Sequence, residues 1–270
     1  MLQKIQETAD YLKKIMPSKP KTGIILGTGL GNLVTQITDK TEVPYETIPN
    51  FPVSTVEGHS GKLIFGKLDG VDVLAMQGRF HYYEGYNMQE VTFPVRVMKA
   101  IGIENLLVSN ASGGMNPDFE IGDLMLITDH INHFPEHPLR GKNYKELGTR
   151  FPDMSEAYSK DFLAKARKIA ADNGIKVVEG VYIGTSGPTF ETPAEYRFYR
   201  ILGGDAVGMS TVPEVIVANH AGMRVFGISI ITDLGVPGKI VEVSHEEVQQ
   251  IGNQVQPLMT LIMSELAKII

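Results

Sequence analysis

The chain has 270 residues, of which 43% are hydrophobic and 21% are charged, and its formal net charge is -6. This negative balance argues against a nucleic-acid-binding protein, whose contact surface is basic. The sequence contains no cysteine, which excludes disulfides, thiolate nucleophiles and cysteine-ligated zinc. The length suits one α/β domain over residues 1–270.

Short apolar runs alternate with helical patterns from one end of the chain to the other. Helical spacing predicts helices at 3–15, 88–101, 156–172, 193–202, 212–221 and 245–268. Apolar runs predict strands at 22–27, 62–68, 71–77, 104–109, 124–128, 177–184 and 224–231. Asp69 and Gly70 separate two of these strands, which indicates a hairpin and therefore a mixed sheet.

Charged residues interrupt every long apolar stretch. Lys4 lies too early for a secretory signal core, and Glu214, His220 and Arg224 break the stretch 212–231. We therefore expect a cytoplasmic protein without a membrane partner.

Three helix starts carry the capping-box pattern: Thr192 with Glu195, Thr211 with Glu214, and Ser244 with Glu247.

A glycine-rich turn, GTGLG at 27–31, follows the first predicted strand. Its spacing matches neither the dinucleotide pattern G-x-G-x-x-G nor the P-loop, which needs a lysine that does not occur here before Lys40. A tight turn between strand and helix would also explain the glycines. The functional interpretation is a small oxyanion site in which backbone N–H groups and the Thr28 hydroxyl donate hydrogen bonds.

Further donors follow other predicted strands and precede a helix. Arg79 and His81 lie on the same side of an extended segment after strand 71–77, and arginine offers a planar fork of donors for phosphate. A second glycine-rich turn, NASGG at 110–114, is predicted after strand 104–109, and Ser210 precedes the helix at 212–221. Together these segments predict a site for free phosphate, although none of them is specific alone.

An aromatic residue beside a carboxylate, Phe190 and Glu191, immediately precedes the Thr192 cap. This pair could stack on and hydrogen-bond to a flat heterocycle, or it could simply pack in the core beside the helix dipole. The histidine-rich segment 129–137 resembles a metal site, but Pro135 prevents the helix that would align its ligands. We therefore expect no metal.

These segments together resemble the purine nucleoside phosphorylases of the homotrimeric type. The resemblance runs from about residue 20 to the C-terminus and is carried by GTGLG at 27–31, EGHSG at 57–61, GRFHYYEGY at 78–86, NASGG at 110–114, RFPDMS at 150–155, GPTFETPAE at 187–195, DAVGMSTVPEVIVANHAG at 205–222 and SHEEV at 244–248. It implies a single α/β domain of the phosphorylase/hydrolase-like fold, with a mixed, largely parallel and partly barrel-like sheet flanked by helices. It also implies cleavage of purine (2′-deoxy)ribonucleosides by inorganic phosphate in purine salvage, with phosphate as co-substrate and no cofactor.

The resemblance also assigns residues to roles. Phosphate would be held by Thr28, Arg79, His81, the backbone N–H of Ala111, and Ser210. Ribose would contact His59, Tyr83, Met209 and His245, and the purine would contact Phe190, Glu191 and Asp233. Catalysis would rest on His81, Glu191 and Asp233, and Phe151 would reach the site of a neighbouring subunit in a homotrimer.

Asp233 departs from the family pattern, because members specific for 6-oxopurines usually have asparagine at this position. An ionised aspartate can only accept a hydrogen bond, so Asp233 is either protonated when the base leaves or accepts from the amino group of a 6-aminopurine. Glu191 suits the N1–H of hypoxanthine or guanine. The sequence thus favours inosine and guanosine and leaves adenosine open.

Three alternatives remain. A methylthioadenosine phosphorylase would share the phosphate site and is compatible with Asp233, but Glu191 and His245 favour a nucleoside with a 5′-hydroxyl. A non-catalytic nucleoside-binding protein would not need a phosphate site. An NAD-dependent dehydrogenase is suggested only by the first glycine turn, whose spacing does not fit.

Overall fold

The protein is described by a computed structural model that covers residues 1–27, 30–53 and 61–270. The predicted site residues Thr28 and His59 lie outside these ranges. The strands of the described part are β1 (Thr22–Leu26), β2 (Ile37–Pro44), β3 (Lys62–Leu68), β4 (Val71–Gln77), β5 (Asn105–Gly114), β6 (Leu124–Asn132), β7 (Val177–Gly184), β8 (Ala206–Gly208) and β9 (Arg224–Leu234). The α-helices are α1 (Leu2–Ile15), α2 (Met88–Val91), α3 (Phe93–Ile101), α4 (Lys160–Asp172), α5 (Pro193–Ile201), α6 (Val212–His220) and α7 (His245–Lys268).

These strands form one mixed sheet in the order β2-β3-β4-β1-β5-β8-β7-β6-β9. Because β5 also pairs with β9, the second half of the sheet closes on itself as a barrel. The hairpin between β3 and β4 turns at Asp69 and Gly70, whose φ angles are 48° and 85°. Both values match the positive φ that a two-residue hairpin turn requires, and the predicted hairpin is confirmed.

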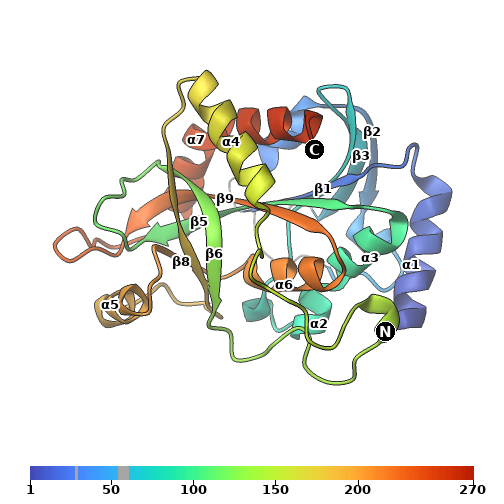
Figure 1. The fold of residues 1–270 in the computed structure, drawn as a ribbon, viewed down its shortest axis with the longest axis horizontal. Coiled ribbons are helices and arrows are strands. Elements are labelled where there is room, and N and C mark those ends of the chain that lie inside the picture. The colour runs from blue at the N-terminus through green and yellow to red at the C-terminus, as the bar shows by residue number, and fades with distance from the viewer. Residues whose placement is uncertain (28–29, 54–60) are drawn as a thin grey trace.

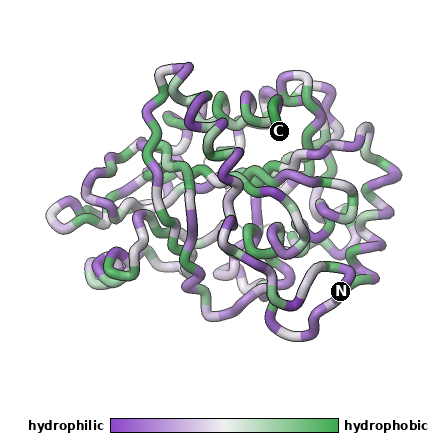
Figure 2. The backbone as a smooth tube through the Cα atoms, viewed as in Figure 1, coloured by the Kyte–Doolittle hydropathy of each residue, from purple (hydrophilic) through white to green (hydrophobic). Residues whose placement is uncertain are grey.

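The helices cover the sheet on both sides. In Figure 1, α4 and α7 lie together above the sheet and α6 lies below it, while α1 and α3 pack against each other at the end opposite the barrel. The central strands are green in Figure 2, in contrast to the purple segments of the outer helices. All five residues of β1 are buried, as expected of a strand that is covered on both faces.

The structure corrects several predicted boundaries. Neither β2 nor β8 is predicted from the sequence, and the predicted helix 88–101 is interrupted at Thr92 because Pro94 has no N–H to donate in the first turn of α3. The predicted helix at 156–172 begins only at Lys160, after a Ser159 cap. The segment 110–114, expected as a turn, continues strand β5.

Within the ranges covered by the structure, no helix combines the length and apolarity needed to cross a bilayer. Over the same ranges, no three histidine or acidic side chains converge as metal ligands.

Candidate active site

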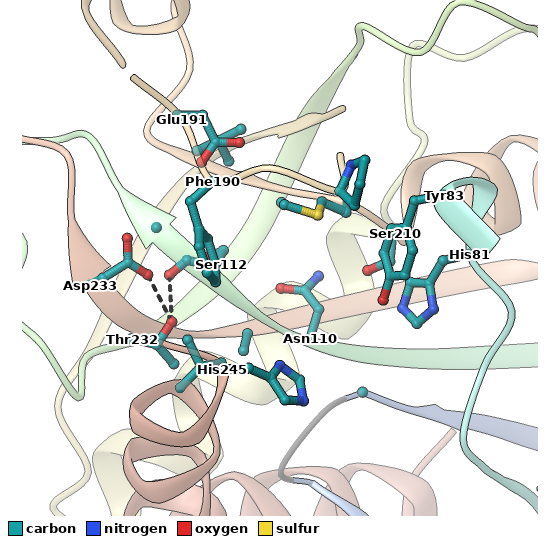
Figure 3. A pocket seen from close by; sticks show the side chains of 18 of the residues that line it. His81, Tyr83, Asn110, Ser112, Phe190, Glu191, Ser210, Thr232, Asp233 and His245 are labelled. Atoms are coloured by element: carbon teal, nitrogen blue, oxygen red, sulfur yellow. Dashed lines mark hydrogen bonds between the residues drawn. The ribbon is translucent and has the colours of Figure 1, made fainter. Parts of the chain in front are cut away.

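A cavity of about 330 Å³ opens at the ends of β4, β5, β8 and β9 (Figure 3). It brings together these residues predicted from the sequence: Arg79, His81, Tyr83, Ala111, Phe190, Glu191, Met209, Ser210, Asp233 and His245. Figure 3 shows His81, Tyr83 and Ser210 at one end of it, and Glu191 and Asp233 at the other.

Arg79 is held rigidly at the first of these ends. Its side chain is 2% exposed. Its Nε donates to Glu214 Oε1 at 2.9 Å, and its Nη1 donates to the Ser109 carbonyl at 2.7 Å and to Ser210 Oγ at 3.3 Å. These acceptors fix the plane of the guanidinium, so this end of the cavity carries an oriented positive charge suited to an oxyanion.

The helix cap predicted at Thr211 is wrong. Thr211 has φ 72° and makes no side-chain cap bond; its Oγ1 instead accepts from Asn110 Nδ2 at 2.8 Å. Glu214, the expected partner in the capping box, accepts from Arg79. Both side chains are used to build the site, whereas the boxes at Thr192 and Ser244 form as predicted.

His81 is oriented by the short 3-10 helix η3 (Tyr82–Glu84). Glu84 Oε1 lies 2.9 Å from His81 Nδ1 and accepts from the His81 backbone N–H at 2.8 Å. Burial lowers the pKa of His81, against the opposing effect of Glu84, so the ring is neutral at pH 7, with Nδ1–H donated to the carboxylate. Tyr83 stacks on this ring at 4.7 Å between centroids.

Strand β5 presents one of its edges to the cavity. Its pairing with β1 ends at Val108 and its pairing with β8 begins at Gly113, and residues between them line the cavity. Gly27 lies so close to this segment that a Cβ there would be 2.8 Å from the Ser109 carbonyl oxygen. The first glycine of GTGLG is therefore required by close backbone packing.

Hydrogen bonds fix the polar side chains of this edge. Ser229 Oγ donates to Asn110 Oδ1 at 2.5 Å and lies 2.6 Å from Ser112 Oγ. Thr232 Oγ1 lies 3.3 Å from the Ser112 carbonyl and 3.0 Å from Asp233 Oδ1. Because these groups are buried and mutually bonded, they give the cavity floor one fixed geometry.

Two carboxyl groups, Glu191 and Asp233, lie at the far end of the cavity with Phe190. Burial raises the pKa of Glu191 to about 7, with a further contribution from Asp233. Burial also raises the pKa of Asp233, against hydrogen bonds from Tyr196 and Thr232. Phe190 is 42% exposed, so its ring can offer a face to a flat ligand.

Phe151 does not reach this cavity. It is 85% exposed, and it lines a separate hollow with His130, His137 and Arg140. Within one chain it is therefore a surface residue.

Comparisons with known proteins agree with one another. Residues 21–268 match the family described as the phosphorylase superfamily. The chain is 56% identical over 256 residues to purine nucleoside phosphorylase 1 of Bacillus subtilis, which covers 95% of this chain and 94% of that protein. The chain belongs to the purine nucleoside phosphorylases.

Solved structures of such phosphorylases superimpose on the whole chain. The Schistosoma mansoni purine nucleoside phosphorylase in complex with adenosine has a TM-score of 0.94 at 41% identity, covering 100% of this chain and 98% of that one. A Schistosoma purine nucleoside phosphorylase in complex with hypoxanthine gives the same values. The expected fold, a mixed and partly closed sheet flanked by helices, is confirmed.

Several residues of this phosphorylase's cavity are not predicted from the sequence. Asn110, Ser112 and Thr232 line it, and Glu84 and Glu214 support it from behind. The first two belong to the recognised sequence NASGG but are ordinary polar residues of a strand. The spacing of Thr211 and Glu214 predicted a helix cap, so nothing in the sequence indicated that Glu214 pairs with Arg79.

Proposed function

We propose that the enzyme cleaves purine ribo- and 2′-deoxyribonucleosides with inorganic phosphate, releasing the free base and a pentose 1-phosphate. The observation that carries this proposal is the different chemical character of the two ends of the cavity. Cationic and hydroxyl donors gather at one end, and an aromatic ring with two carboxyl groups gathers at the other. A phosphate and a purine fit these two ends, with the sugar between them. We propose residues 1–270 as one catalytic domain.

Phosphate binds, in this proposal, to Arg79, His81, Ser210 and the Ala111 N–H, with Thr28 as a further donor. Cleavage of the glycosidic bond builds positive charge on the sugar, and a phosphate held beneath it stabilises that charge and is placed to attack. The neutral His81, with Nδ1–H directed to Glu84, has Nε2 as a proton acceptor for a protonated phosphate oxygen.

The purine binds to Phe190, Glu191 and Asp233. Negative charge develops on the leaving base, and donors near its N7 and position 6 stabilise it. Ionised Glu191 accepts from N1–H of a 6-oxopurine, so we propose inosine and guanosine as preferred substrates. Adenosine is the further substrate, because an ionised Asp233 can accept from the 6-amino group.

The ribose lies between these ends, beside Tyr83, Met209 and His245, with His59 as a fourth contact. The raised pKa of Tyr83, about 12 because of burial, keeps its hydroxyl protonated and able to donate to a sugar oxygen. We propose a homotrimer in which Phe151 covers the cavity of the next subunit, which is supported by its exposure in the single chain. Phosphate replaces the base at the sugar carbon as co-substrate, so the proposed reaction needs no organic cofactor.

The test is an assay of inosine, guanosine, adenosine and methylthioadenosine with purified enzyme, with and without phosphate. The proposal expects release of base only with phosphate, fastest for inosine or guanosine. Faster cleavage of methylthioadenosine would favour that related phosphorylase instead. Binding without phosphate-dependent release would indicate a non-catalytic nucleoside-binding protein.

A further inference from the structure

Arg96 on α3 is a second buried arginine, and it lies outside the candidate active site. It is 7% exposed, and its Nη1 donates to the Leu147 carbonyl at 3.2 Å. Arg79 is paired with Glu214, whereas none of the ion pairs within 1–27, 30–53 and 61–270 involves Arg96. Burial lowers the pKa of Arg96 to about 10, which leaves it charged at pH 7. A buried charge without a counter-charge is costly, so Arg96 needs a negative partner.

A small hollow opens beside this arginine, between α3, the end of α6 and the segment 138–147. It has about 20 Å³ of space, which suffices for one particle about the size of a water molecule. Its lining residues include four that are basic: Arg96, Arg140, Lys142 and His220. No acidic side chain of the described ranges lines it. In a chain of net charge -6, this local excess of positive charge favours an anion.

His220, the last residue of α6, adds a second unmet group to the wall of the hollow. Both of its ring nitrogens are buried and lack a hydrogen-bond partner among the residues that the structure describes. Burial lowers the pKa of His220, as does the positive charge of Arg96, against the Thr149 backbone, which lies outside hydrogen-bond geometry. The ring is therefore neutral at pH 7 and keeps one N–H. A negative charge nearby would stabilise this N–H dipole as well as Arg96.

The hollow is preformed by close backbone packing. Gly148 has φ 144°, and a Cβ at this position would lie 2.1 Å from the His220 carbonyl oxygen and 2.9 Å from His220 Nε2. Only glycine permits this approach. The segment that carries Leu147 is thus held against the end of α6 on one side and against Arg96 on the other. The walls have a fixed geometry that an ion can enter without rearranging the chain.

We propose that this hollow is a structural anion site, in which one chloride ion binds beside the Arg96 guanidinium and fastens the segment 138–148 to α3 and α6. Chloride suits the small volume, and unlike water it neutralises the buried charge. Arg140 and Lys142, which are exposed, add positive potential at the mouth. No residue that lines this hollow also lines the cavity at the strand ends, so the anion site does not depend on the proposed phosphorolysis.

The first test is thermal unfolding of the wild-type enzyme in sodium chloride and in sodium gluconate, mixed so that the ionic strength stays constant. Gluconate is too large for the hollow and serves as the inert anion. Because an ion that binds only the folded state raises the Tm, replacing gluconate by chloride up to about 200 mM should raise the Tm by about 3 °C. A Tm that does not change on this replacement would overturn the proposal.

The second test locates the effect with two variants. Arg96→Gln removes the buried charge, so its Tm should be the same in chloride and in gluconate. Arg197→Gln is the matched control, since Arg197 is an exposed arginine on α5 and its loss should leave the chloride dependence of the Tm intact. Equal chloride dependence in wild type and Arg96→Gln would show that chloride acts elsewhere, which would refute the site.

A third test needs no variant, so it remains decisive even if Arg96→Gln does not fold. Wild-type enzyme is crystallised in sodium bromide, and anomalous diffraction is measured at the bromine absorption edge. We expect an anomalous peak beside the Arg96 guanidinium, in the hollow that His220 also lines. A water molecule there without anomalous signal, or a carboxylate of a neighbouring copy of the chain in contact with Arg96, would overturn the proposal.

Discussion

Arg79 and Glu214 form an ion pair of 2.9 Å between the end of β4 and the first turn of α6, with side chains 2% and 3% exposed. The pair joins residues that are 135 positions apart in sequence. It therefore ties the end of the cavity that we propose for phosphate to the helix that follows Ser210. A charge buried this deeply depends on its partner.

The first prediction is that Glu214→Gln destabilises the protein by about 3 kcal/mol, because the buried charge of Arg79 loses the carboxylate to which its Nε donates. Urea unfolding measures this difference. Glu179→Gln is the control, since its ion pair with Arg167 is 40% and 45% exposed and should be worth under about 1 kcal/mol. Equal stability of the two variants would contradict the prediction.

Ser210→Ala should raise the KM for phosphate about tenfold and change the KM for inosine much less. The reason is that Ser210 Oγ, beside Arg79 Nη1, loses a hydrogen bond to a charged ligand. Steady-state kinetics with phosphate as the varied substrate measures the effect. The control is Ser155→Ala, which removes a hydroxyl bonded to exposed Asp153 and should leave both KM values unchanged. An unchanged KM for phosphate in Ser210→Ala would show that the anion binds elsewhere.

Glu191→Gln should lower kcat/KM for inosine about 100-fold while the fold is retained, because a neutral amide replaces the carboxylate that accepts from N1–H. In the wild-type enzyme, kcat/KM should rise with pH through about 7, where Glu191 ionises. Glu195→Gln is the matched control, since glutamine can serve equally in the capping box with Thr192. Near-normal rates in Glu191→Gln would remove this residue from the purine site.

The same substitution should affect stability in a pH-dependent way. Folding raises the pKa of Glu191 from 4.5 to about 7, so the folded state favours the protonated form. That advantage is complete below about pH 4.5 and is lost as the pH rises through about 7. Glu191→Gln should therefore melt a few degrees above wild type at pH 8.5 and close to it at pH 5. Thermal melts of both proteins at pH 5 and pH 8.5 measure this difference in melting temperature. A difference that grows toward acidic pH would be incompatible with a raised pKa of Glu191.

Phe151→Ala should raise the KM for inosine about tenfold without destabilising the subunit, if Phe151 covers the site of a neighbour. Ile201→Ala is the control, since Ile201 is similarly exposed at 83%. Co-refolding Phe151→Ala chains with Glu191→Gln chains offers a sharper measurement. Some cavities of the mixed oligomers combine a native Glu191 with a native Phe151 from the neighbouring subunit. The activity of the mixture should therefore exceed that of either variant alone. No gain on mixing would exclude the shared site.

Local patterns were sufficient to predict most elements. Helix α7 has the predicted bounds, and the β3–β4 turn could be recognised from Asp69 and Gly70 alone. By contrast, β2 carries five polar or charged residues in eight, and β8 has only three residues. Such strands are fixed by their neighbours in the sheet, and their sequences carry little periodic signal.

The candidate site likewise contains residues that could be predicted from the sequence and residues that could not. Arg79 follows a strand and Glu191 precedes a helix. Both could be predicted to lie near the same site, because the carboxyl ends of parallel strands meet at one edge of a sheet. Tyr196 could not, because one tyrosine within an amphipathic helix is indistinguishable from a core residue until the structure shows its hydroxyl bonded to Asp233. Glu214 likewise needed the Arg79 contact, which depends on long-range topology.

The pairing of β5 with β9 sets a distance as well as a shape. Ala111, proposed for phosphate, and Gly113, opposite Asp233, are two residues apart on one strand, which corresponds to about 7 Å at the usual rise. In the proposed function, this fixed spacing along the strand sets the distance between the phosphate and the base, with room for a pentose between them. Loop changes can reshape the mouth of the cavity, but a longer sugar would require the strands themselves to be re-registered.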